Sequence, residues 1–273
     1  PAYESIRVIA MEEMTHLGRI FNLLTSLGKA DVLPPDALPV FPGNLPDGVL
    51  NGATVALRGL DEAQLALFLA IEFPNHAPGL APTIPPGIHP DIGQTIGAFC
   101  QRLRTAVERS DRSLWQDRGQ VEFEQGLVRI APIRSRAEAL AALDDILREG
   151  EGAASSPADT SPQDLAHYYR FLAIWEGRSI GMVGEEWAWS EATPVPRPPS
   201  RPLTGDRTTA PDDVREQLES FGVKYEEMLE ALRAGWRTDD EGPVLDAWLA
   251  MRDLTPIGVA LAEQGYTPPF SRA

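Results

Sequence analysis

The sequence has one cysteine, fewer positive than negative charges, and no long apolar run. Cys100 is the only cysteine, so an internal disulfide and a thiolate-rich metal site are excluded, and we expect a reducing, cytoplasmic location. Lys and Arg number 24 against 40 Asp and Glu, and the net charge of -16 repels nucleic acid and anionic lipid. Neither a membrane span of roughly 18 apolar residues nor a signal peptide is recognisable. We therefore expect neither a nucleic-acid nor a membrane partner.

What the sequence does contain is enough apolar residues, 43% of 273, for one sizeable core. Apolar residues recur every three or four positions in several segments, which is the spacing of a buried helix face. This pattern predicts bundle helices at about 1–28, 61–73, 135–152 and 161–177, a further helix over 95–107, and C-terminal helices at about 212–236 and 244–265. We expect a mainly α protein with a single domain, 1–273.

Proline and glycine dominate the connections between these helices. Residues 32–51 and 74–93 read as long proline-rich insertions, and 181–202, with Trp187 and Trp189, reads as irregular. Short strands are expected at 53–60 and in a hairpin over 121–130. The predicted architecture is a helical bundle with long insertions and at most a few short strands.

Two ionisable residues interrupt the apolar face of the first predicted helix. Glu13 and His16 continue the stripe that runs from Ile9 to Ile20. Burying either side chain without a partner is costly. Residues three apart on a helix project over the same turn, so one carboxylate and one imidazole can hold one ion together. We interpret this pair as metal ligands.

A second pair of the same kind occurs in the helix expected at 161–177, where Asp164 and His167 share a face with Phe171 and Ile174. Two such helices, joined by single glutamates from two others, build a di-metal site in a bundle interior. Glu151, one turn past Leu147, and Glu72 are the candidate single glutamates. Mixed oxygen and nitrogen donors suit one or two ions of iron first, or manganese or zinc.

Several of these positions have alternative interpretations. Asp164 stands where the carboxylate of a capping box would stand after Ser161 and Pro162, which would leave His167 as the ligand of that helix. Glu12 is the alternative to Glu13, although it lies off the stripe and is expected to face solvent, as is Glu149. His76 and His89 lie in proline-rich segments, where exposed or structural roles are expected.

Around these residues the sequence resembles the bacterial ferritin-like family that includes the iminophenyl-pyruvate dimer synthases of bisindole pigment pathways. The similar segments, in order, are Glu12 to Leu17, Phe41 to Gly43 with Leu45 and Pro46, Ile71 and Glu72, Thr95 to Gly97, Gly150 to Gly152, and His167 to Phe171. The resemblance implies a ferritin-like bundle with metal ligands at Glu13, His16, Glu151 and His167, together with Glu72.

The resemblance also implies an enzyme of the oxidase or oxygenase type in secondary metabolism, acting on a small substrate derived from an amino acid. The alternative is a metal-stabilised binding protein without turnover. Iron storage is disfavoured, because long insertions would obstruct the packing of a storage shell.

The sequence departs from the family in two ways. Position 164 carries aspartate where the family has glutamate, and the helix that usually precedes the Glu-x-x-His helix is missing from the chain. Residues upstream of Pro1, a partner chain in a homo-oligomer or other complex, or the segment 212–236 with Glu216, Glu219 and Glu226, could each supply that helix. We favour the first explanation.

Overall fold

The fold is taken from a computed structural model of the chain. It describes residues 1–273 except 30, 35–37, 46–48, 51–52, 75–94, 112–114, 153–155, 159–163, 239 and 271–273, and it leaves out the side chains of 151, 191 and 192. The predicted insertion at 74–93, with His76 and His89, lies almost wholly outside the described residues.

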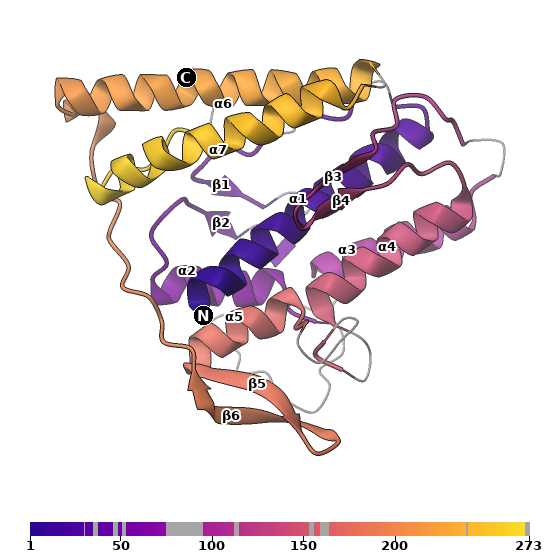
Figure 1. Ribbon diagram of the computed structural model, residues 1–273, viewed down its shortest axis with the longest axis horizontal. Helices are drawn as coiled ribbons and strands as arrows, with labels where there is room; N and C mark the ends of the chain where they lie inside the picture. Colours follow the sequence, from indigo (N-terminus) through magenta and orange to yellow (C-terminus); the bar gives the residue numbers. More distant parts are fainter. Residues whose placement is uncertain are drawn as a thin grey trace.

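The centre of the molecule is the long helix α1, Ala2–Ser26, which confirms the first predicted helix (Figure 1). Around it lie α2, Glu62–Ile71, α4, Arg136–Glu151, and α5, His167–Glu176. Helix α5 packs on α1, α2 and α4, while α3, Ile96–Glu108, covers the outer side of α4.

Side-chain caps fix where three of these helices begin. Asp61 starts α2 and Thr95 starts α3, each accepting a hydrogen bond from a backbone N–H of the first turn. Ser135 starts α4 in the same way, accepting from the N–H of Glu138 at 3.2 Å. The Glu138 carboxylate accepts from the N–H of Arg134, so the predicted helix start at Ser135 is confirmed.

We expect Ser135→Ala to lower the free energy of unfolding by about 1 kcal/mol, because the N–H of Glu138 loses its acceptor. Urea denaturation followed by circular dichroism measures this change. Ser220→Ala is the matched control, because Ser220 is exposed inside the helix Asp212–Thr238. It should change the free energy of unfolding by less than about 0.5 kcal/mol. Equal effects of the two substitutions would contradict the cap.

The short strands pair as antiparallel hairpins. In the described residues β1, Gly43–Asn44, pairs with β2, Thr54–Val55, and β3, Phe123–Gln125, pairs with β4, Val128–Ile130, around Gly126. The third pair joins β5, Arg178–Val183, to β6, Glu186–Pro194. The expectation of irregular structure over 181–202 was therefore wrong for its first half. Trp187 and Trp189 give β6 the aromatic content of a strand, and they pack against the core beside α5.

Two long C-terminal helices form a layer on the other side of α1 (Figure 1). They are α6, Asp212–Thr238, and α7, Gly242–Glu263, close to the predicted ranges. They pack on each other and on β3 and β4 through one apolar core. Buried Asn22 fastens this layer to α1, because it accepts from Trp236 Nε1 at 2.8 Å and pairs with the backbone of Val121.

The helix that carries His167 begins later than predicted. Asp164 to Ala166 are not helical, and α5 starts at His167 with Ala166 as its N-cap. Asp164 therefore does not cap the helix, and its carboxylate accepts from Arg170 at 2.8 Å instead. The end of the helix is as predicted, at Gly177 in the left-handed conformation that favours glycine. Among the described helices, none is long and apolar enough to cross a membrane.

Candidate metal centre

Both histidines of the predicted site are buried between helices, and they face each other. His16 on α1 is 7% exposed and His167, at the start of α5, is 0% exposed. Their ring centroids are 5.4 Å apart. The close approach of these two rings from different helices brings together two of the side chains that the sequence proposed as ligands.

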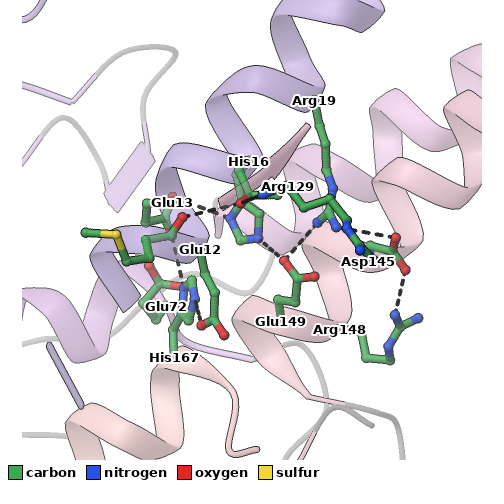
Figure 2. Close-up of polar contacts among 12 residues, drawn as sticks. Glu12, Glu13, His16, Arg19, Glu72, Arg129, Asp145, Arg148, Glu149 and His167 are labelled. Atoms are coloured by element: carbon green, nitrogen blue, oxygen red, sulfur yellow. Dashed lines mark hydrogen bonds and ion pairs between the residues drawn. The ribbon is translucent and has the colours of Figure 1, made fainter. Parts of the chain in front are cut away.

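Glu13 lies between the two rings (Figure 2). Its Oε1 is 3.0 Å from Nδ1 of His167, and its Oε2 is 3.5 Å from Nδ1 of His16. One oxygen for each histidine is the arrangement of a bridging carboxylate. The Glu13 side chain keeps 49% of its exposure, so this contact lies where the cluster meets solvent.

Three further carboxylates complete the cluster from three helices. Glu12 on α1 lies 3.0 Å from Nε2 of His167, and Glu149 on α4 lies 2.6 Å from Nε2 of His16. Glu72, the C-cap of α2, lies 3.7 Å from Nδ1 of His167. We call Glu12, Glu13, His16, Glu72, Glu149 and His167 the carboxylate–histidine cluster.

Gly150 of α4 lies next to the carboxylate at the end of α2. A Cβ atom at position 150 would lie 3.4 Å from Oε2 of Glu72, an ordinary van der Waals contact. The Glu72 carboxylate therefore lies against the end of α4, where the neighbouring residue is Glu149.

The charges of the cluster stabilise one another. Burial alone would raise the pKa of Glu13, but hydrogen bonds and the charges of His16 and His167 lower it to about 2. Burial alone would lower the pKa of His167, whereas Glu12, Glu13 and Glu72 together raise it to about 11. The pKa of His16 is raised in the same sense by Glu13 and Glu149, against the effect of burial. Without an ion, His167 therefore holds a proton as the counter-charge of these carboxylates.

The donor set fits a metal ion. One donor atom each from Glu13, His16 and His167 lies within 4.8 Å of the others. Two ligands of one ion, each about 2.1 Å from it, are at most about 4.2 Å apart, so a side-chain movement of about half an ångström would bring all three donors onto one ion. Nδ1 of His167 is buried and, among the described residues, has no partner in hydrogen-bond geometry. Four carboxylates and two imidazoles are also the donors that iron and manganese accept.

Family membership follows from the sequence of the same helices. Residues 2–176, which span α1 to α5, match the ferritin-like family. The chain belongs to the ferritin-like family. A solved structure of a ferritin-like protein from Caulobacter vibrioides has a TM-score of 0.65 and 19% identity, covering 99% of this chain and 86% of that one. At this identity the likeness to that structure concerns the fold alone. No curated protein matches the chain.

In this ferritin-like domain the structure brings together four of the six predicted ligands, Glu13, His16, Glu72 and His167. Asp164 is outside the cluster and pairs with Arg170. Glu151 is the last residue of α4, and its side chain lies outside what the structure describes. The ligand role of Glu151 therefore stays a prediction.

Two members of the cluster were expected to face solvent, and both expectations were wrong. The Glu12 side chain is 20% exposed and the Glu149 side chain is 16% exposed. Glu12 turns inward because α1 packs against α5 as well as α4, so its buried face is wider than one stripe. The buried face of α4 runs through Leu143, Ile146 and Gly150 rather than Leu147, and Glu149 borders that face. The three-residue step from Ile146 was the available signal for Glu149.

Two substitutions distinguish the ligands found in the structure from those predicted from the sequence. We expect Glu12→Gln to weaken metal binding by about tenfold, because it removes a charged donor beside His167. Asp164→Asn should leave metal content unchanged, because Asp164 pairs with Arg170. Metal analysis of both purified proteins measures the difference. A loss confined to Asp164→Asn would restore the sequence-based assignment.

Proposed function

We propose that the carboxylate–histidine cluster binds one or two metal ions, iron first, and that the protein is a metal-dependent enzyme of the oxidase or oxygenase type. The observation that carries this proposal is the convergence of four carboxylates from three helices on the fully buried His167 and its neighbour His16. Each ring nitrogen of both histidines faces a carboxylate oxygen. This arrangement suits a cation better than an uncharged imidazole pair.

The residues of the cluster would have different roles. Glu13, Glu72 and the Nδ1 atoms of His16 and His167 would hold the metal. Glu12 and Glu149 would accept hydrogen bonds from the Nε2–H groups of the two rings and so fix their orientation. Bound iron would supply redox chemistry with dioxygen. Glu13 is the partly exposed member, so small reactants would reach the cluster past its carboxylate, while buried Tyr168 and Phe171 of α5 keep water from the other side.

The substrate proposed is a small molecule derived from an amino acid, such as an imine. This step rests on the resemblance to iminophenyl-pyruvate dimer synthases, and fold alone does not fix a substrate. The alternative is a metal-stabilised binding protein without turnover, in which the ion would only join α1, α2, α4 and α5.

Metal analysis of protein purified without chelator, followed by anaerobic loading with ferrous iron and exposure to oxygen, tests the proposal. Stoichiometric oxygen uptake with a change in absorbance supports the oxidase type. Bound zinc with no oxygen uptake supports the binding protein, and repeated turnover of iron into mineral supports storage. Protein that binds no divalent ion would refute the metal site altogether.

A further inference from the structure

A pocket of about 250 Å³ lies between the β1–β2 hairpin and the residues that follow α7. Its lining includes Phe41, Pro42, Ala56, Leu57, Arg207 and Phe270. None of the described residues that line it belongs to α1, α2, α4 or α5, the helices that carry the carboxylate–histidine cluster. The pocket is therefore a candidate binding site in its own right.

The apolar part of the lining includes two aromatic rings. Phe41, Leu57 and Phe270 supply the larger apolar side chains. The Phe270 ring packs edge-on against Phe221 and Tyr225 of α6, with ring centroids 5.0 Å and 5.5 Å away. Because these contacts fix the Phe270 ring, a flat apolar ligand would find this wall already in place.

Arg207 is the charged residue in the described lining of the pocket. Its Nη2 donates to the backbone oxygens of Thr267 at 3.0 Å and Pro268 at 3.4 Å, which holds the guanidinium in place. Among the described residues no carboxylate forms an ion pair with it, since the adjacent Asp206 accepts hydrogen bonds from Thr208 instead. The other N–H groups of the guanidinium therefore remain available to an anion.

The segments that carry Arg207 and Phe270 are fastened to each other. The N–H of Gly205 donates to the backbone oxygen of Gly265 at 2.9 Å. A Cβ atom at position 205 would lie 2.5 Å from the ring of Tyr266, so glycine is needed for this close approach. The charged and apolar walls consequently keep a fixed spacing, which lowers the cost of ordering them around a ligand.

We propose that this pocket binds a small aromatic carboxylate, with its ring against Phe41 and Phe270 and its carboxylate on Arg207. The volume is below the roughly 300–1,000 Å³ of sites for drug-sized ligands, so a single ring with a short acidic group fits. The net charge of -16 disfavours polyanions such as nucleotides, whereas one carboxylate can be matched by one arginine. Binding at this pocket does not depend on the proposed metal function.

Titration of the metal-free full chain with phenylacetate, followed by ligand-observed NMR, tests this inference. We expect a dissociation constant on the order of 1 mM or below. Acetate lacks the ring and 2-phenylacetamide lacks the charge, so each should bind at least about tenfold more weakly. Wild-type protein that bound no phenylacetate at about 10 mM, or bound acetate equally well, would overturn the inference.

Two variants of the lining locate the ligand. Arg207→Gln removes the charge, and Ala56→Leu fills the pocket while it keeps the arginine; each should weaken phenylacetate binding at least about tenfold. Arg201→Gln is the matched control, because Arg201 also donates to a backbone oxygen, that of Glu263 at 3.0 Å, but is not part of the described lining. It should bind phenylacetate as the wild type does. Unchanged binding in folded Arg207→Gln and Ala56→Leu would place the ligand elsewhere and refute the pocket.

Discussion

Replacing His167 with alanine should lower metal affinity by more than about 100-fold, because it removes a ligand that contacts three carboxylates at once. The remaining Glu12, Glu13 and Glu72 would still attract cations, but they would lack the imidazole donor that joins them. Without an ion, the same substitution leaves these carboxylates facing one another and opens a cavity in a fully buried position. We therefore expect lower stability as well as lower metal content.

Metal analysis after purification without chelator, together with calorimetric titration, measures the effect of His167→Ala. His167→Gln fills most of the cavity and separates loss of the ligand from loss of packing. The control is His89→Ala, which alters a histidine expected in a proline-rich loop and should retain full metal content. Equal metal content in all of these proteins would refute the site assignment.

Metal affinity should rise steeply with pH. In the metal-free protein the pKa of His167 is raised to about 11, so its ring holds a proton at neutral pH, and the pKa of His16 is raised in the same direction. A metal ion binds only the deprotonated ring nitrogen, so binding must release these protons. Each released proton makes the apparent affinity rise about tenfold per pH unit, up to the pKa of the ring.

Calorimetric titration in buffers of different ionisation enthalpy counts the protons released between pH 6 and 8. We expect at least about one proton for each histidine that gains an ion. His167→Gln should abolish the proton that is released from the His167 ring. Metal affinity that does not change with pH would show that the ring nitrogens are not ligands.

The free energy of unfolding of the metal-free protein should fall both at high pH and at low pH. The folded pKa of His167 is about 11, above the unfolded value of 6.5, so its contribution is complete below pH 6.5 and is lost as pH rises through 11. The folded pKa of Glu13 is about 2, below its unfolded 4.5, so its contribution is present above pH 4.5 and is lost as pH falls through 2. The cluster therefore stabilises the metal-free fold most between about pH 4.5 and 6.5.

Helix positions could be predicted well because periodicity and caps are local signals. The run of apolar residues on α1 and the Ser135 cap of α4 each depend on residues close in sequence. The start of α5 could not be predicted in this way. Ser161 and Pro162 suggest a cap, but the first helical residue in the structure is His167, and Asp164 pairs with Arg170.

The sequence alone determined that Glu13 and His16 lie one turn apart on the first helix, and that His167 lies in a second apolar helix. That information is local, since helical spacing sets which neighbours share a face. Only the tertiary structure decided which other carboxylates reach them. Glu12 and Glu149 join the cluster because α1 packs against α5 and α4 together, and the rotation of each helix about its axis depends on packing across the whole bundle.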